Sequence, residues 1–240
     1  DYNVYETESR IGDKIEFQRG LNMNKEWSEL NKTMQAQIKK KDTYKMGIDT
    51  LFNLRRQLMQ TLVSFKEDLC REDFNAIPFI NADGYHSKTI AYSIWHIFRI
   101  EDIVAHTVIT EDEQVFFTGN YQVRINSPII TTGNELVKQQ IADFSKQLNL
   151  EELYSYIFEV RESTEKILER FSYDELKWKI PDERKGYLKS LNVVNCDEKA
   201  IWLIDYWCSK DIRGLIQMPF SRHWIMHTEA CLRIKNKIHS

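Results

Sequence analysis

Residues 42–69 read DTYKMGIDTLFNLRRQLMQTLVSFKEDL, and this stretch indicates the fold class most clearly. Its apolar side chains recur at three- and four-residue spacing, which places them on one face of an α-helix. They are Met46, Leu51, Leu54, Leu58, Leu62 and Phe65. Asp42 is a suitable N-cap residue. The stretch therefore predicts a long amphipathic helix whose apolar face packs against other helices.

The same periodicity predicts helices on both sides of this stretch. Upstream, Trp27, Leu30, Met34 and Ile38 predict a short helix over about residues 23–38. Downstream, Ser87 can cap a helix to about residue 110, and another is expected to begin at Thr132 or Asn134 and end near residue 148. Further helices are expected over residues 149–171, with an N-terminal capping box of Asn149 and Glu152, over 197–213, ending at Gly214, and from Pro219 and Ser221 to about 238.

Three segments between these helices lack a helical period. Residues 71–86 carry turn-forming residues and are expected to be a loop, and residues 172–196 are polar and mixed. Residues 111–132 are the least helical, and Val115-Phe116-Phe117 predicts a small strand or an ordered loop.

Few residues in the chain break helices, since 240 residues include only 8 Gly and 4 Pro. The expected fold is therefore all-α, with four long helices and long connections forming a four-helix bundle over residues 43–240. Residues 1–42 are expected to be an N-terminal arm and a short helix that packs on the bundle, with residues 1–20 irregular.

Composition and the absence of certain motifs argue against several classes of protein. The net charge of −3 argues against a nucleic-acid partner. Polar side chains interrupt the longest apolar run, around Ile90–Ile97, so no membrane span is expected. No apolar segment follows a basic one, so no signal peptide is expected, and four scattered cysteines indicate reduced thiols in a cytoplasm. Phosphate-binding loops, dinucleotide-binding turns, nucleophile elbows and HExxH motifs do not occur in the sequence.

Two histidines, His223 and His227, are one turn apart in the last predicted helix. This spacing places both imidazoles on one helix face, where one metal ion can reach both. That face also carries Phe220, Trp224 and Ile234, so it is expected to point into the core. The alternative is that each imidazole hydrogen-bonds to a backbone carbonyl or a buried acid.

A third histidine, His96, lies on the core-facing side of a second helix together with Tyr92 and Ile100. A ligand from a second helix is the usual way in which helical bundles complete a metal site. His106 is rotated about 80° from that face, so it is a weaker candidate. We therefore expect His106, His86 and His239 to be surface or loop residues.

The segment Trp95-His96-Ile97-Phe98-Arg99-Ile100-Glu101-Asp102, combined with His223-x-x-x-His227, resembles the DinB/YfiT-like superfamily. The resemblance covers about residues 43–238, and the two histidine segments are its specific part. It implies a four-helix bundle in which His96, His223 and His227 bind one divalent transition metal ion per chain, with zinc or nickel expected. It also makes a homodimer plausible. The segments 1–42 and 111–132 go beyond the minimal bundle.

Three imidazole ligands leave a coordination position for water or substrate. A metal ion there can lower the pKa of a bound water or thiol. Because some members of the superfamily transfer low-molecular-weight thiols, the resemblance implies metal-dependent thiol transfer, or hydrolysis, on a small substrate. The expected pocket is lined by Tyr92, Trp95 and Trp224. The alternatives are a non-catalytic bundle that the metal ion stabilises and that binds a small molecule or a protein partner, and a bundle without metal.

Other polar residues are weaker candidates. Cys231 continues the stripe of His223 and His227 but lies about 12 Å along the helix from His223, so a buried cysteine is the better interpretation. The same holds for Cys208. Asp205 and Asp102 could orient an imidazole, whereas Glu101 is rotated about 140° from His96 and is expected in an exposed salt bridge.

Overall fold

The computed structural model describes residues 23–240, so the predicted irregular arm over residues 1–20 lies outside the described residues. The described residues form helices joined by turns and loops and contain no β-strand, only an isolated antiparallel bridge between Lys179 and Asp211. The prediction of an all-α fold is therefore confirmed. None of the helices within residues 23–240 combines the length and the apolar character that crossing a membrane requires.

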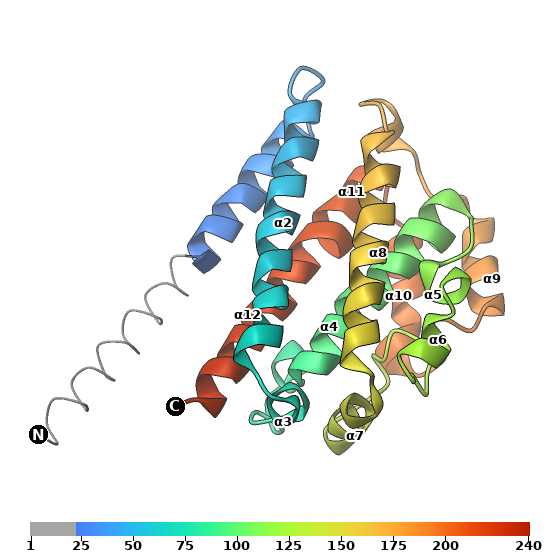
Figure 1. Cartoon of the computed structure of the whole chain (residues 1–240). Coiled ribbons are helices and arrows are strands. Elements are labelled where there is room, and N and C mark those ends of the chain that lie inside the picture. Colours follow the sequence, from blue (N-terminus) through green and yellow to red (C-terminus); the bar gives the residue numbers. More distant parts are fainter. Residues whose placement is uncertain (1–22) are drawn as a thin grey trace, which may run out of the picture.

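Four helices form the centre of the molecule: α2 (Tyr44–Asp68), α4 (Ile90–Asp102), α8 (Leu150–Glu169) and α12 (His223–Ile238). They contact one another in a ring, in which α2 packs on α8, α8 on α4, α4 on α12 and α12 on α2 (Figure 1). The stretch at residues 42–69 contains α2, and its predicted apolar face is buried from Leu51 to Phe65. Met46 is exposed, and Thr43 rather than the predicted Asp42 is the N-cap, without a side-chain hydrogen bond.

Residues 23–37 are helical and run beside α2 (Figure 1), in agreement with the predicted helix over 23–38. Trp27, Met34 and Ile38 are buried between this helix and the central helices. The turn that joins the two helices is tight, because a Cβ atom on Gly47 would lie 2.5 Å from Cγ2 of Ile38. Glycine at position 47 therefore permits the close approach.

The central helix α4 is buried along its whole length, since each of its residues from Ile90 to Asp102 is buried. Thr89, rather than the predicted Ser87, is its N-cap, and its Oγ1 accepts a hydrogen bond from the Tyr92 amide at 3.0 Å. The helix continues as a π-helix, η2 (Ile103–Thr110), which ends at Glu111 with φ of 60°. The predicted end near residue 110 is therefore correct.

The connections contain short helices that the periodicity did not indicate. Residues 71–86, predicted as a loop, include α3 (Arg71–Asn75) and the 3-10 turn η1 (Gly84–His86). The small strand or ordered loop predicted at Val115–Phe117 is not found, because the segment forms α5 (Val115–Thr118), followed by α6 (Tyr121–Arg124). The cause is a long-range cap: the buried Asp102 carboxylate accepts hydrogen bonds from the amides of Val115 and Phe116, both at 2.9 Å.

Helix α7 (Gln139–Gln147) begins later than predicted, and residues 132–138 remain a loop. Asn149 caps α8 as expected, by accepting a hydrogen bond from the Glu152 amide at 3.3 Å. The polar segment 172–196 contains η3 (Glu175–Lys177) and α9 (Glu183–Ser190).

The predicted helix over residues 197–213 is two helices, α10 (Glu198–Cys208) and α11 (Ile212–Gln217). Asp211 interrupts it, because its carboxylate accepts a hydrogen bond from the Gly214 amide at 2.7 Å and caps α11. Gly214 therefore lies inside α11 and does not end the preceding helix. Pro219 belongs to a π-helix, η4 (Met218–Arg222), which leads directly into α12.

Candidate metal centre

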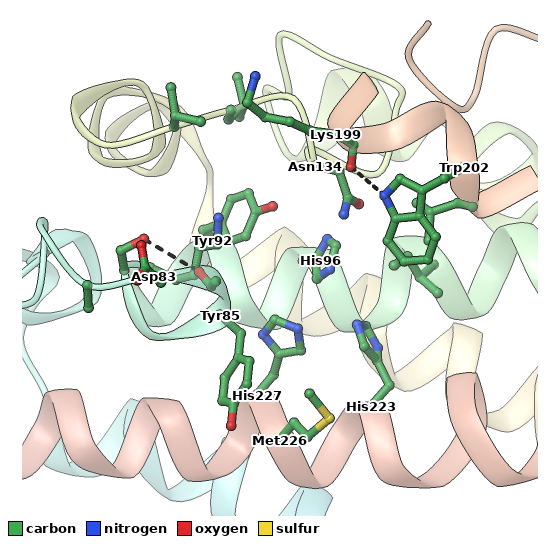
Figure 2. A pocket seen from close by; sticks show the side chains of 18 of the residues that line it. Asp83, Tyr85, Tyr92, His96, Asn134, Lys199, Trp202, His223, Met226 and His227 are labelled. Carbon is green, nitrogen blue, oxygen red and sulfur yellow. Dashed lines mark hydrogen bonds between the residues drawn. The ribbon is translucent and has the colours of Figure 1, made fainter. Parts of the chain in front are cut away.

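Three histidine side chains from two of the central helices meet at one point. His96 extends from α4, and His223 and His227 extend from the first two turns of α12 (Figure 2). Their ring centroids are 5.1 Å apart for His96 and His223, 4.8 Å for His96 and His227, and 4.6 Å for His223 and His227. One nitrogen from each ring lies within 4.8 Å of the other two.

This spacing is close to that of ligands around one ion. Zinc binds imidazole nitrogen at about 2.0–2.1 Å in tetrahedral geometry, so the separations between its ligand nitrogens are in the range of about 3.3–3.4 Å. Small rotations of the three rings would bring their nitrogens within this range. The structure thus brings together the three residues that the sequence predicted as ligands.

The loop after α6 orients the ring of His96. Nδ1 of His96 lies 2.7 Å from the carbonyl oxygen of Thr132. When Nδ1 carries the proton, it donates a hydrogen bond to this carbonyl. The lone pair is then on Nε2, which remains free to bind a metal ion. Tyr92 positions the same loop, because its hydroxyl donates a hydrogen bond to the carbonyl of Gly133 at 2.8 Å.

The other two imidazoles lack such partners. Nδ1 of His223 and Nδ1 of His227 are buried, and no described residue forms a hydrogen bond with either atom. A buried polar group without a partner costs about 1–3 kcal/mol, so two adjacent ones require a compensating interaction. A metal ion bound through Nδ1 would supply it, and the donor set of three imidazoles suits a transition metal. The alternative was that every one of the three rings has a protein partner. Among the described residues, only His96 has one.

Burial keeps the three imidazoles in the neutral form that binds metal ions. Desolvation, opposed in part by the bond to Thr132, lowers the pKa of His96 to about 4. The pKa values of His223 and His227 are lowered well below the ordinary value, first by desolvation and then by the neighbouring imidazoles. The rings therefore do not have to lose a proton at neutral pH before they bind a metal ion.

The metal-free protein is expected to lose stability as the pH falls from about 6.5 to about 4. In this window the unfolded chain protonates His96 at its ordinary pKa of 6.5, whereas the folded chain keeps it neutral down to about 4. The unfolded state then binds more protons, so the free energy of unfolding decreases with falling pH. His96 alone contributes roughly 3 kcal/mol, since each unit is about 1.4 kcal/mol.

Denaturant unfolding of chelator-treated protein between pH 7 and pH 4.5 measures this loss. The control is a variant with His96, His223 and His227 replaced by glutamine, in which the stability should fall less steeply over the same range. An equally steep loss in the variant would show that other groups cause it.

A pocket of about 690 Å³ adjoins the histidine cluster. Its walls come from the segment before α4, the loop before α7, helix α10 and the start of α12. Tyr92 and Trp202 lie on opposite sides of His96 (Figure 2). Trp202 extends from α10, and its side chain remains 48% exposed.

The predicted lining of this pocket is correct for Tyr92 and wrong for the two tryptophans. Trp95 is fully buried against Phe116 and Phe144 in the core, and Trp224 donates a hydrogen bond from Nε1 to Glu101 at 2.7 Å. The aromatic residues that line the pocket instead include Trp202, Tyr206 and Trp207 of α10. The sequence carried a weak indication of this, an aromatic-rich helix whose polar positions are few.

The acidic candidates do not contact the cluster. Glu101 is fully buried, contrary to the expected exposed salt bridge, and pairs with Arg55 at 2.7 Å. Asp102 accepts a hydrogen bond from the Tyr156 hydroxyl at 2.8 Å and caps α5. Asp205 is exposed and pairs with Lys185 at 2.7 Å, so it does not orient an imidazole.

The cysteine candidates are outside the cluster as well. Cys208 and Cys231 are free and buried, as the packing interpretation expected. Desolvation raises the pKa of Cys231 to about 12, so its thiol stays protonated at neutral pH. Neither cysteine belongs to the group of potential ligands.

His106 is buried, which corrects its expected place on the surface. Its Nδ1 lies 2.7 Å from Oδ1 of Asp112, and its Nε2 lies 3.0 Å from Oγ of Ser163. The ring of His106 therefore contacts α8 and does not belong to the cluster. His86 is half-buried beside Tyr85, and His239 is exposed.

Comparison with known proteins adds no assignment, since neither a protein-family model nor a curated protein sequence matches this chain. The histidine cluster and its pocket are therefore the features that indicate what the protein does.

Proposed function

We propose that His96, His223 and His227 hold one divalent transition metal ion, zinc or nickel, and that the protein transfers a small thiol to an electrophilic substrate in the adjoining pocket. The observation that carries the proposal is the convergence of three buried, neutral imidazoles, two of them without a protein partner, beside a pocket of about 690 Å³. We also propose that the chain is a DinB-like bundle, which the ring of α2, α8, α4 and α12 supports.

The bound metal ion would supply a coordination position at which a thiol loses its proton near neutral pH. The residues of the chain have the complementary tasks. Thr132 fixes the tautomer of His96, and the hydrophobic packing of α4 against α12 keeps the three imidazoles at one point. Tyr92 stacks on His96 at a centroid distance of 5.3 Å and restricts the rotation of its ring.

The lining of the pocket favours a thiol over water as the nucleophile. Hydrolysis benefits from a carboxylate that takes a proton from the attacking water. Among the described residues that line the pocket, Asp83 is the only carboxylate, and it is exposed on the segment before α4. A thiol depends less on such a base than water does, because a coordinating thiol would be deprotonated outright, whereas a metal-bound water would keep a pKa of about 7.

The reaction is a substitution at carbon. The thiol sulfur forms a bond to the electrophilic carbon of the substrate, and the bond from that carbon to the leaving group breaks. The leaving group departs with the bonding electron pair, and the thiol proton has passed to solvent. No oxidant or reductant takes part.

The test is the conjugation of a small thiol to monochlorobimane, a chloroalkyl probe that becomes fluorescent when sulfur replaces chloride. Zinc- or nickel-loaded protein should accelerate conjugation of 2-mercaptoethanol or 3-mercaptopropionate over the uncatalysed rate, and chelation should abolish the acceleration. A His223→Ala/His227→Ala variant should not accelerate it. If metal raises the melting temperature without any acceleration, the protein is instead a non-catalytic bundle that the metal ion stabilises.

A further inference from the structure

One lysine is placed close to the histidine cluster. Lys88 immediately precedes Thr89, the N-cap of α4, and lines the same pocket as Tyr92 and His96. Its Nζ lies 5.0 Å from the centroid of the Tyr92 ring.

This ammonium group has no anionic partner in the described part of the chain. The side chain of Lys88 is half-buried, and no residue within 23–240 forms an ion pair or a hydrogen bond with Nζ. Burial lowers the pKa of Lys88. A cation that is partly removed from water and lies beside a metal site is unfavourable unless an anion joins it. The position therefore fits a ligand that brings the negative charge.

Most of the other charged residues that line the pocket are also basic. Lys138 and Lys199 also line it, and Asp83 is the only acidic residue among the described lining residues. Lys199 is partly neutralised, since its Nζ lies 3.5 Å from Oδ1 of Asp197 outside the lining. The pocket thus carries an excess of positive charge, although the chain has a net charge of −3. Such a local excess attracts anions.

We propose that Lys88 binds a carboxylate of the substrate, and that Trp202 contacts an apolar group at the other end of the same molecule. Tyr92, which Lys88 contacts, and Trp202 are on opposite sides of His96 (Figure 2), so the cluster lies between the two contacts. The substrate class is therefore an amphipathic carboxylic acid, with its reacting atom between the acidic and the apolar ends. The location of the reacting atom rests on the proposed function, whereas the binding of the carboxylate does not.

The first measurement uses cobalt-loaded protein and two thiols that differ in charge. A thiol bound to the ion places its other end in the pocket, so the carboxylate of 3-mercaptopropionate stands in for the acidic end of the substrate. Cobalt uptake is visible from the absorption bands of the ion, and binding of a thiolate adds a charge-transfer band. We expect 3-mercaptopropionate to bind about tenfold more tightly than 2-mercaptoethanol, a factor equivalent to about 1.4 kcal/mol. Lys88→Met should abolish this preference, and Lys88→Arg should restore it. Lys45→Met, which removes an exposed lysine outside the pocket, should leave it unchanged.

The second measurement does not require a metal ion. Tryptophan fluorescence of the chelator-treated full chain reports binding of 4-phenylbutyrate and of its neutral amide, and the carboxylate should bind about tenfold more tightly only when residue 88 is basic. Equal affinities for the charged and neutral compounds, or a preference that survives Lys88→Met, would overturn the assignment of Lys88. Absence of cobalt bands or of any thiolate band would instead count against the proposed function, and the fluorescence titration would still decide the carboxylate site.

Discussion

Replacing His223 and His227 with alanine is expected to lower the bound metal from one ion per chain to none. Each replacement removes one of three imidazole ligands, and a single remaining ligand does not hold an ion against a chelator. Since the loss of partners that merely orient a ligand costs 10- to 100-fold in metal affinity, we expect loss of one ligand to cost more than about 100-fold. His96→Ala alone should therefore have an effect of that size. The measurement is metal content after dialysis against a competing chelator.

The matched control is His106→Gln. His106 is also buried, but its ring contacts Asp112 and Ser163 and not the cluster. This variant should retain one ion per chain, even if it unfolds at a lower temperature. Loss of metal from His106→Gln, or retention of metal in the double alanine variant, would contradict the assignment of the ligands.

Arg55→Met is expected to lower the free energy of unfolding by about 3–5 kcal/mol, the cost of leaving a buried charge unpaired. The guanidinium of Arg55 is fully buried and donates to both carboxylate oxygens of Glu101, at 2.9 and 2.7 Å. It also donates to the carbonyl of Phe220 at 3.0 Å and lies 4.3 Å from the Trp224 ring. Arg55 therefore joins α2 and α4 to the segment that carries His223 and His227.

Denaturant unfolding measures this loss, and two variants control for it. Arg56→Met, at the exposed neighbouring position on α2, should change the free energy of unfolding by less than about 0.5 kcal/mol. Arg55→Met/Glu101→Leu removes both members of the buried pair and should recover part of the loss. The recovery is incomplete because Glu165 loses its contact with Arg55 and Nε1 of Trp224 loses its acceptor. A small effect of Arg55→Met, or a double variant less stable than the single one, would show that the ion pair does not hold these helices together.

The sequence was sufficient for the features that depend on local periodicity. The apolar stripe of residues 42–69 predicted α2, and Asn149 predicted the start of α8, because both depend on contacts within one helix. The histidine pair was also visible, since residues four apart share a helix face. The contact between this pair and His96 was expected because the apolar faces of the two helices that carry them were both predicted to point into one core.

Features that depend on contacts between distant segments could not be predicted from periodicity. Glu101 was expected at the surface because α4 was assumed to have one exposed face, whereas α4 is enclosed on all sides. Asp102 caps a helix that begins 13 residues later, and this contact turned a predicted strand into α5. The pocket is likewise formed by segments far apart in the chain, so Lys88 and Trp202 were not candidates from their local sequence.

The metal content of the protein purified without an affinity tag tests the central claim most directly. Elemental mass spectrometry should find about one equivalent of a transition metal per chain, or one equivalent taken up on titration of the metal-free protein with zinc or nickel. A protein that contains no transition metal and takes up neither ion would contradict the account and leave the three imidazoles as a packed polar cluster in a helical bundle.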